Sequence, residues 1–377
     1  MSLYRLVWPL LSRLDPEAAH RLTIRMLKSG AGALWPARRD PPALHLCALG
    51  LDFPNPIGIA AGFDKDGEVA GPLLKLGFGF VEAGTVTPRA QEGNARPRLF
   101  RLAEDRAVIN RMGFNNRGAP ALAARLGRAR PPGIIGINIG ANRQSSDFAA
   151  DYVTAFDYVA PYADYIAINV SSPNTAGLRG LQERGPLVDL LARLNGVRTQ
   201  AARPLPILLK IAPDLDAPGL ETIVEVALGA GIAGLIVANT TVGGRAGLKS
   251  AHAAETGGLS GAPLFRRSTD ALAEVARLAA GRLTLVGAGG VFSARDAYEK
   301  ILCGASLVQL YTALVYEGPG LVARIKQGLA ELLAADGFSN VREAIGARIS
   351  LSSRVDGGGK VLGLNHVTLS APPQGSS

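Results

Sequence analysis

Short apolar runs alternate with longer segments of helical periodicity between residues 56 and 335. Continuous apolar strands joined by crossover helices are typical of a parallel sheet covered by helices. Eight strand–helix repeats predict a closed (β/α)8 barrel, the TIM barrel of the α/β class, and a doubly wound open sheet is the alternative. The predicted strands span 56–61, 78–84, 134–140, 164–170, 206–212, 234–239, 283–288 and 307–311. The clearest helical segments between them span 184–199, 217–229, 266–280 and 293–303.

The first 40 residues carry a helical pattern of their own. Asp15 and Pro16 are a strong start signal for the second of two helices, with Asp15 as N-cap and Pro16 at the first helical position. One apolar side and one cationic side are typical of helices at a membrane interface, although a hairpin packed on its own domain is the alternative. The apolar positions are Leu3, Leu6, Val7, Leu10, Leu11 and Leu14, then Ala18, Ala19, Leu22, Met26 and Leu27. The cationic positions of the second helix are Arg21, Arg25 and Lys28.

These patterns divide the chain into three predicted parts. Residues 1–40 form a helical extension, and residues 41–345 form the barrel with its proline-bearing connection. Residues 346–377 form a tail rich in Gly, Ser and Pro, which we expect to be flexible. The tail matches no functional motif, so it is assigned no function.

Composition narrows the classes of partner. At 377 residues and 47% hydrophobic positions, the chain can bury a substantial core. Its 40 basic and 31 acidic residues give a net charge of +9, which suits an anionic substrate, a phosphate-bearing cofactor, an acidic lipid surface or nucleic acid. The sequence lacks a run of five Lys or Arg and has only 6% aromatic residues, which argues against nucleic acid. No apolar stretch reaches about 18 residues, so no spanning helix is expected.

Cysteine and histidine usage argues against a disulfide framework and against a metal site. The only cysteines, Cys47 and Cys303, lie in apolar surroundings without a CxxC motif, which favours a reduced compartment. The four histidines are scattered, and no HExxH motif or carboxylate–histidine cluster has ligand spacing. The amino terminus lacks the long apolar region of a secretory signal.

Polar side chains gather where the predicted strands end. The run Asn169–Thr175 places two carboxamides, three hydroxyls and a proline directly after an apolar strand. Such groups are costly to bury unless a ligand or water satisfies them. Because the carboxyl ends of barrel strands meet at one mouth, we expect an active site there. The other polar residues at strand ends are Lys65, Thr85, Asn138, Lys210, Asn239 and Thr312.

Glycine-rich turns after the last strands predict a site for phosphate. Val286–Gly290 follows the seventh strand, with Ser293 as the expected cap of the next helix, and Leu310–Thr312 ends the eighth. Backbone N–H groups after strands seven and eight are the usual phosphate cradle of such barrels. Gly257–Gly261 adds a third turn after strand six. Together the three turns predict a phosphate-bearing cofactor, although one glycine turn alone is weak evidence.

Carboxamides and lysines predict an organic anion. Asn110–Asn116, Asn174 and Asn239 supply donors and acceptors, which suit a heterocycle with alternating N–H and C=O edges. Lys65 offers a countercharge for a carboxylate. Lys210 ends an apolar strand and must meet an anion or shift its pKa. A Schiff-base lysine of an aldolase is an alternative, but the amide-rich neighbours favour a bound flavin.

Ten motifs between residues 60 and 314 resemble the dihydroorotate dehydrogenase family in both order and spacing. Ser172, where soluble class 1 members carry cysteine, resembles the class 2 branch, which is quinone-dependent and membrane-associated. The basic amphipathic helices in residues 1–40 resemble that branch as well. The motifs are AAGFDKDG (60–67), EAGTVTPRAQ (82–91), RLFRL (98–102), NRMGFNN (110–116), INIGAN (137–142), NVSSPNT (169–175), LLKIAPDL (208–215), ANTT (238–241), GGLSGAPL (257–264) and QLYTAL (309–314).

The resemblance implies oxidation of (S)-dihydroorotate to orotate in de novo pyrimidine (UMP) biosynthesis, with FMN as hydride acceptor and a quinone as final electron acceptor. By position, Ser172 is the base that takes the C5 proton while C6 delivers hydride. A serine hydroxyl is a poor base alone, so we expect Thr175 and an ordered water, shielded by Phe114, to relay the proton. The resemblance also implies that residues 1–40 form the quinone entrance, peripherally bound at the cytoplasmic face of the inner membrane.

The resemblance further implies which residues bind ligands. Lys210 places positive charge by the flavin pyrimidine edge, and Arg101 and Tyr311 line the quinone end. Ala238 stands where some members have threonine, so any flavin contact there is through the backbone. The substrate-binding residues are Lys65, Asn110, Arg111, Met112, Gly113, Phe114, Asn169, Asn174, Asn239 and Thr240. The FMN-binding residues are Ala61, Gly62, Phe63, Asp64, Lys65, Thr85, Asn138, Asn169, Lys210, Ala238, Gly261, Gly290, Tyr311 and Thr312.

Two rival functions fit the sequence less well. A flavin barrel for dihydropyrimidine or dihydrouridine reduction would use a cysteine acid or a nicotinamide partner, and the sequence signals neither. A non-enzymatic barrel that binds a phosphate ligand would be colourless, whereas stoichiometric FMN makes a protein yellow.

Overall fold

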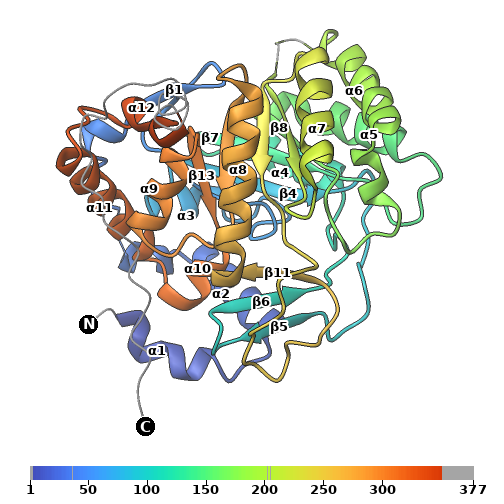
Figure 1. Cartoon of the computed structure of the whole chain (residues 1–377). Helices are drawn as coiled ribbons and strands as arrows, with labels where there is room; N and C mark the ends of the chain where they lie inside the picture. Colours follow the sequence, from blue (N-terminus) through green and yellow to red (C-terminus); the bar gives the residue numbers. More distant parts are fainter. Residues whose placement is uncertain (1–2, 36, 202, 204, 350–377) are drawn as a thin grey trace.

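The computed structural model describes residues 3–35, 37–201, 203 and 205–349. Eight strands form a closed parallel barrel in sequence order, which confirms the predicted (β/α)8 architecture (Figure 1). Residues 350–377, most of the predicted tail, lie outside the described residues. The barrel strands are β3 (Ile57–Ile59), β4 (Phe80–Val86), β7 (Ile134–Ile139), β8 (Tyr165–Asn169), β9 (Ile207–Ile211), β10 (Gly234–Val237), β12 (Thr284–Ala288) and β13 (Leu307–Leu310).

Apolar side chains of neighbouring barrel strands lie in register and form the core. Ile166 of β8, for example, pairs with Ile207 of β9, and both are fully buried. Large rings are accommodated by glycines on the adjacent strand, because a Cβ at Gly136 would lie 2.0 Å from the ring of Tyr165. Dense packing of this kind leaves the strand ends as the place for a site.

Helices cover the outside of the barrel and begin where the sequence supplies caps. Asp147, Asp216 and Ser293 each accept a hydrogen bond from a backbone N–H three residues on, at 3.1, 3.0 and 3.2 Å. The predicted cap at Ser293 is thereby confirmed. The helices are α3 (Ala70–Lys75), α4 (Ala119–Arg128), α5 (Phe148–Val159), α6 (Arg184–Arg198), α7 (Ala217–Gly229), α8 (Phe265–Ala279), α9 (Ala294–Leu302), α10 (Thr312–Glu317), α11 (Leu321–Ala335) and α12 (Val341–Ala344). Short 3-10 turns are η1 (Ala31–Leu34), η2 (Pro42–Leu44), η3 (Ala160–Tyr162), η4 (Leu178–Gln182) and η5 (Ala262–Leu264).

A small antiparallel sheet that the sequence analysis did not predict lies at one end of the barrel. Its central strand, β6, pairs with the adjacent β5 and with the distant β11. Four-residue strands inserted in barrel connections show too little alternation to be told from loops. The strands are β5 (Leu99–Leu102), β6 (Ala107–Asn110) and β11 (Gly258–Gly261), and a hairpin of β1 (Leu46–Ala48) and β2 (Leu51–Phe53) lies at the opposite end (Figure 1).

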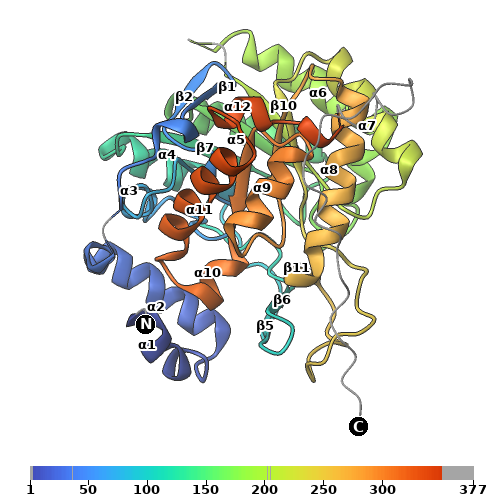
Figure 2. The same cartoon turned by 60° about the vertical axis from the view of Figure 1, so that its left-hand side comes forward.

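Two amino-terminal helices, α1 (Leu3–Leu11) and α2 (Pro16–Lys28), lie at the same end of the barrel as β5 and β6 (Figures 1 and 2). The Asp15 carboxylate accepts a hydrogen bond from a backbone N–H of α2 at 2.8 Å, which confirms the predicted helix start. No helix in the described ranges is long and apolar enough to cross a bilayer.

A buried ion pair fastens α2 to the barrel. Glu17 is 6% exposed, and its carboxylate lies 2.9 Å from Arg98, the residue before β5. Burial favours the neutral acid, but hydrogen bonds from Arg98 and Arg96 outweigh it and lower the pKa of Glu17 to about 2. The helical extension is therefore docked on the barrel by a specific contact as well as by apolar packing.

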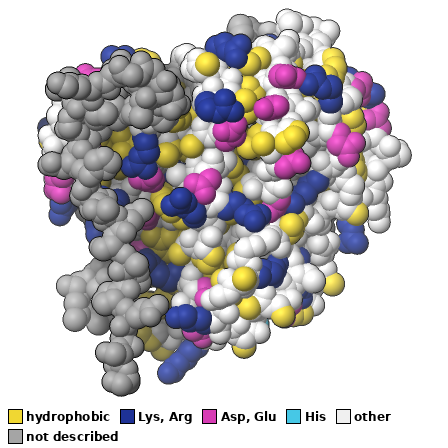
Figure 3. Space-filling view, viewed as in Figure 1, with side chains coloured by type: hydrophobic (Ala, Val, Ile, Leu, Met, Phe, Trp, Pro, Cys, Tyr) yellow, Lys and Arg dark blue, Asp and Glu magenta, His cyan; other side chains and the backbone are white. Residues whose placement is uncertain are grey.

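Charged side chains of both signs are interspersed over the face of the molecule shown in Figure 3. The positive net charge therefore does not form a single basic patch on that face. This distribution gives no support there to a nucleic-acid surface, which would gather its basic residues.

Candidate active site

A pocket of about 500 Å³ opens at the carboxyl ends of the barrel strands and continues beneath α1 and α2. Its position agrees with the predicted site at one mouth of the barrel. Strand ends and the β5–β6–β11 sheet line its inner part, and the amino-terminal helices line its outer part. The predicted site residues that line it are Ala61, Gly62, Phe63, Lys65, Thr85, Asn110, Met112, Gly113, Phe114, Asn169, Ser172, Asn174, Lys210, Ala238, Asn239, Thr240, Gly261, Gly290, Tyr311 and Thr312.

Three residues that were predicted to bind ligands do not line the pocket. The Asp64 carboxylate accepts hydrogen bonds at 2.6 and 2.8 Å from two backbone N–H groups of its own turn. Asn138 is fully buried and donates to Glu82 at 2.8 Å in the barrel interior. The Arg111 guanidinium lies 2.7 Å from the Glu255 carboxylate, and this ion pair directs the side chain away from the pocket. The motifs placed these residues near the site without showing the direction of their side chains. For Arg111 the resemblance implies a contact through the backbone, which the side-chain ion pair leaves possible.

The inner carboxamides are held by a chain of hydrogen bonds. Asn239 donates to Asn169 at 3.1 Å and to the Ser171 hydroxyl at 2.9 Å. Asn169 donates to the Thr85 hydroxyl at 3.0 Å, and Thr85 donates to Asn138 at 2.6 Å. Because these contacts fix which atoms donate and which accept, the remaining edges face the pocket in one orientation.

Two lysines bring positive charge to the inner part. Lys65 donates to the Gly62 carbonyl oxygen at 2.8 Å, and burial lowers its pKa to about 8. Lys210 is 6% exposed and has no hydrogen-bond partner within the described residues. Burial lowers the pKa of Lys210, and the charge of Glu82 opposes this effect. A buried ammonium that faces a pocket without a partner indicates that a ligand supplies the acceptor.

The loop after β8 places one hydroxyl in the pocket and buries a second one that does not line it. Ser172 is 5% exposed, lines the pocket and accepts a hydrogen bond from the Asn174 backbone N–H at 3.3 Å. The Thr175 hydroxyl is buried and has no hydrogen-bond partner among the residues described. A buried hydroxyl without a partner fits a site that an ordered water completes.

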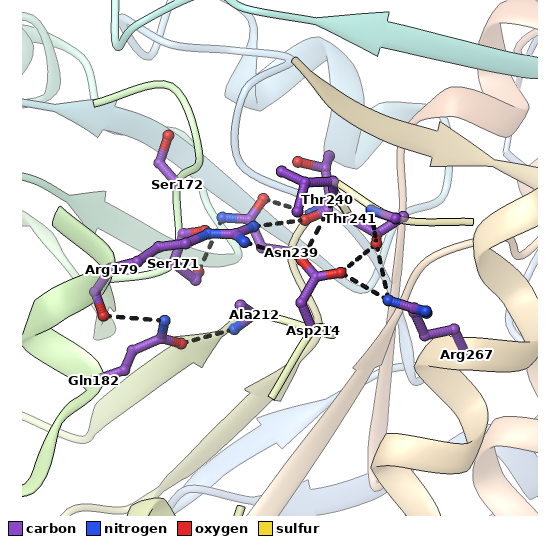
Figure 4. A network of polar contacts seen from close by, with 12 residues as sticks. Ser171, Ser172, Arg179, Gln182, Ala212, Asp214, Asn239, Thr240, Thr241 and Arg267 are labelled. Carbon is purple, nitrogen blue, oxygen red and sulfur yellow. Dashed lines mark hydrogen bonds and ion pairs between the residues drawn. The ribbon is translucent and has the colours of Figure 1, made fainter. Parts of the chain in front are cut away.

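An arginine that the sequence analysis missed holds this loop in place (Figure 4). Arg179 donates to the Ser171 carbonyl at 3.1 Å, to the Thr240 carbonyl at 3.3 Å and to the Asp214 carboxylate at 3.0 Å. Arg267 donates to the same carboxylate at 2.9 Å from the other side, and the Ser172 hydroxyl points away from this network (Figure 4). A single arginine in a short 3-10 turn, η4, carries no sequence signal. Asp214 lies inside the motif 208–215, to which the sequence analysis gave no role at this position.

The glycine turn after β12 fits a phosphate group. The φ angles of Gly289 and Gly290 are 99° and 75°, and a Cβ at Gly290 would lie 2.5 Å from the Cβ of Phe265. Their backbone N–H groups have no hydrogen-bond partner in the described part of the chain. Gly261 faces the same pocket with a φ of 101°. Backbone N–H groups without a partner can donate to an anionic oxygen, and a turn without side chains lets that oxygen approach them closely.

The outer part of the pocket is apolar and aromatic. The rings of His20 and Tyr311 both pack near Phe63, each with a centroid distance of 5.4 Å. Burial lowers the pKa of His20 to about 3, so its imidazole is neutral at physiological pH. The Arg101 guanidinium lies 5.5 Å from the Trp8 ring centroid, and both Arg101 and Tyr311 line this end.

A closed (β/α)8 barrel with these groups at its mouth has the architecture of an enzyme with a polar, cationic binding site. Within the described residues, no group of three His, Cys, Asp or Glu side chains is arranged to hold a metal ion. The particular family follows from comparison with known proteins. A family model described as "Dihydroorotate dehydrogenase" matches residues 43–333, so the chain belongs to the dihydroorotate dehydrogenase family. This family is flavin-dependent.

Individual relatives agree over nearly the whole chain. A protein of Rhodospirillum rubrum named "Dihydroorotate dehydrogenase (quinone)" is 56% identical over 347 residues, covering 91% of this chain and 94% of the relative. A protein of Parvibaculum lavamentivorans with the same name is 55% identical, covering 93% of this chain and 100% of the relative. A solved structure of DHODH from Eimeria tenella in complex with ferulenol has a TM-score of 0.85 and 38% identity, covering 91% of this chain and 98% of that chain.

Proposed function

We propose that this protein oxidises dihydroorotate to orotate in pyrimidine biosynthesis, with FMN as its flavin and a membrane quinone as final electron acceptor. The observation that carries the proposal is the single pocket with a polar, cationic inner part and an apolar outer part. The names of the relatives support the reaction. An aldolase-type Schiff base at Lys210 would leave the glycine turn and the apolar outer part without a role.

The inner residues fit FMN. The turn Gly289–Gly290, with Gly261 and Thr312, would hold the phosphate, and the ammonium of Lys210 would face the electron-rich edge of the ring. These residues would hold FMN, and the chemistry it would supply there is acceptance of the hydride from C6 of dihydroorotate and transfer of the two electrons to a quinone. The rest of the chemistry belongs to the side chains of this chain.

Dihydroorotate needs a countercharge and a fixed orientation. The Lys65 ammonium would pair with its carboxylate, while Asn110, Asn174 and Asn239 would bind the alternating N–H and C=O edges of its ring. Asn174 donates to Asn110 at 3.2 Å, so these two carboxamides act as one unit. Backbone groups from Arg111 to Phe114 would close this side of the ring.

Ser172 would take the C5 proton. Its hydroxyl must lose its own proton as it accepts the new one, so the site needs an exit for a proton. Thr175 fits that exit, since its buried hydroxyl has no partner within the described chain, and an ordered water would join the two hydroxyls. Phe114 lines the pocket and would shield the exchange from bulk water.

The outer part would admit the quinone from a membrane. Leu10 and Leu34 are 67% and 65% exposed, and Val7 and Met26 are 38% and 42% exposed. Val7, Met26 and Leu34 line the apolar end of the pocket on α1, α2 and η1, and Leu10 lies on α1 as well. Burial of these side chains in lipid would be favourable. We infer that residues 1–40 associate peripherally with the cytoplasmic face of the inner membrane.

A comparison of electron acceptors tests the proposal. Purified yellow protein in liposomes, supplied with dihydroorotate, should reduce a ubiquinone analogue and should use NAD⁺ or fumarate far more slowly. Preference for NAD⁺ or fumarate would contradict the assignment to the quinone-dependent branch. A colourless protein that binds no flavin would support a non-enzymatic barrel instead.

A further inference from the structure

Lys300 in α9 is a fully buried cation behind the pocket wall. Its ammonium donates to the hydroxyls of Ser268 and Thr269 in α8, at 2.9 and 3.0 Å. No carboxylate of the described residues lies within 4.0 Å of it. Burial of an ammonium among neutral groups is costly. The buried position of Lys300 therefore indicates that a negative charge from outside the chain compensates it.

A second buried lysine shows how this fold compensates such a charge. Lys326 in α11 is 1% exposed, and its ammonium lies 2.6 Å from the Asp40 carboxylate. Asn55 donates to the same carboxylate oxygen at 2.9 Å, which fixes the pair. One buried ammonium is therefore neutralised within the chain, whereas Lys300 meets two hydroxyls and an aromatic ring but no carboxylate.

The acidic groups nearest to Lys300 are engaged elsewhere. Asp296 accepts a hydrogen bond from a backbone N–H at the start of α9, at 2.9 Å, and Asp270 pairs with the exposed Arg266 at 3.2 Å. Burial raises the pKa of the Cys303 thiol, which is therefore neutral. The nearby acidic groups raise the pKa of Lys300, but burial has the larger effect and lowers this pKa to about 7.

A short path leads from Lys300 to the glycine turn. The Ser268 hydroxyl, which accepts from Lys300, lies within hydrogen-bond distance of the Gly289 carbonyl oxygen at 3.2 Å. The ammonium lies 5.1 Å from the ring centroid of Phe265, the residue on which the turn packs. A Cβ at Gly287, in β12 before the turn, would lie 3.0 Å from the Lys300 side chain. Lys300 therefore stands directly behind the turn, on the side away from the pocket.

We propose that Lys300 is the electrostatic partner of the cofactor phosphate and selects a phosphorylated flavin over an unphosphorylated one. The proposal rests on the binding of FMN proposed above. A phosphate in the turn would give the buried ammonium its missing countercharge, and the ammonium would in turn stabilise the dianion. Riboflavin offers no such charge. Lys300 is a positioning residue that acts through Ser268 and the turn.

Two substitutions separate charge from hydrogen bonding. Lys300→Met removes both, whereas Lys300→Gln is one atom shorter and keeps an N–H donor for the hydroxyls. Affinities for FMN and riboflavin are measured on the full deflavinated chain by quenching of flavin fluorescence. In both variants we expect FMN affinity to fall about tenfold to a hundredfold, because an interaction between close buried charges is lost. Riboflavin affinity should stay within about twofold of its wild-type value, since that ligand has no charge to lose.

Phosphorus NMR of the holoprotein provides a second readout that a purely structural role would not move. The bound phosphate should remain dianionic at lower pH in the wild type than in either variant, because the buried ammonium favours the dianion. Lys326→Met is the matched control, since it also removes a fully buried lysine. It should lower thermal stability and leave the ratio of FMN to riboflavin affinity unchanged.

Three outcomes decide between the interpretations. Equal losses of FMN and riboflavin affinity in the Lys300 variants would contradict the proposal and assign Lys300 a structural role. A selective loss in Lys300→Met but not in Lys300→Gln would assign the effect to the hydrogen bonds and contradict a role for charge. Wild-type protein that binds no FMN would contradict the proposed function itself.

Discussion

The inner and outer parts of the pocket are built from different chemistry. The inner part has lysines, hydroxyls and carboxamides on strand ends, fixed by hydrogen bonds that reach into the barrel. The outer part has apolar side chains on two short helices, and its His20 is neutral. A rigid polar site suits the orientation of a small anion, and an apolar passage suits a lipid-soluble acceptor. Because the two parts are built separately, we expect flavin reduction by dihydroorotate and flavin reoxidation by quinone to be separable. A change in one part should then spare the half-reaction of the other part.

Substitution of Ser172 should cause the largest loss in the rate of flavin reduction, the half-reaction of the inner part. Loss of a general base typically costs about 10²–10⁴-fold, so Ser172→Ala should slow flavin reduction by dihydroorotate by that factor. Reoxidation of chemically reduced enzyme by quinone should be unchanged. Stopped-flow absorbance measures both steps, and Ser146→Ala, at an exposed serine that does not line the pocket, is the control. Near-normal flavin reduction in Ser172→Ala would remove the serine from the reaction.

Removal of α1 should impair only quinone reduction, the half-reaction of the outer part. Truncation of residues 1–14 keeps the Asp15 cap and the Glu17–Arg98 ion pair, but it removes the pocket-lining side chains of Tyr4, Val7, Trp8 and Leu11. Quinone turnover should fall about tenfold to a hundredfold, the equivalent of one buried apolar side chain or more.

Flavin reduction by dihydroorotate should stay within about twofold in the truncated protein. The hydrogen bond and ring contacts that α1 makes to the rest of the described chain go to Arg101, Val315 and Tyr316, and none of these residues is in a barrel strand. Steady-state rates with a quinone analogue and single-turnover rates with dihydroorotate measure the two effects. Equal losses in both half-reactions would show that α1 supports the whole fold and not a separate entrance.

The Arg179 contacts test whether the position of the Ser172 loop matters within the inner part. Arg179→Gln removes the link between the Ser171 and Thr240 carbonyls, and a misplacement of about 1 Å can cost about a hundredfold in rate. We expect slower flavin reduction with a larger deuterium isotope effect at C5, and normal quinone reoxidation. Arg267→Gln, which loses a contact to the same Asp214 without touching either carbonyl, is the matched control. Equal effects of the two variants would show that the network supports stability and not the position of Ser172.

The Lys65 pKa predicts a pH dependence of the inner part. Because burial lowers the pKa to about 8, the ammonium is present below that pH and is lost above it. Orotate affinity should therefore be constant below about pH 8 and should weaken about tenfold per pH unit above it. Titration of flavin fluorescence measures it, with uracil, which lacks the carboxylate, as control. The same pH dependence for uracil would show that Lys65 does not bind the carboxylate.

Sequence patterns predicted the barrel well because its strands are continuously apolar and end in polar residues. The helix caps at Asp15 and Ser293 were also predicted from the sequence, because capping depends on residues next to each other in the chain. The β5–β6–β11 sheet was missed because its strands are short and its β6–β11 pairing joins segments far apart in the chain. Long-range pairing of this kind leaves no local pattern.

Site residues were predicted as positions but not as directions. Asp64, Asn138 and Arg111 lie in motifs of the site, yet neighbouring partners hold their side chains away from the pocket. Arg179 and Lys300 were missed for the opposite reason, because each acts through contacts with distant elements. Such roles depend on tertiary packing and become visible only in three dimensions.

Anaerobic mixing of the holoprotein with dihydroorotate, followed by a quinone analogue in liposomes, tests the two-part pocket most directly. The visible absorbance of the flavin should fall on the first addition and recover on the second. Ser172→Ala should lose the first change, yet after chemical reduction its absorbance should still recover on addition of the quinone analogue. The protein without residues 1–14 should lose only the second change. If both variants slow both changes equally, or if dihydroorotate leaves the wild-type absorbance unaltered, the separation of the two half-reactions is wrong.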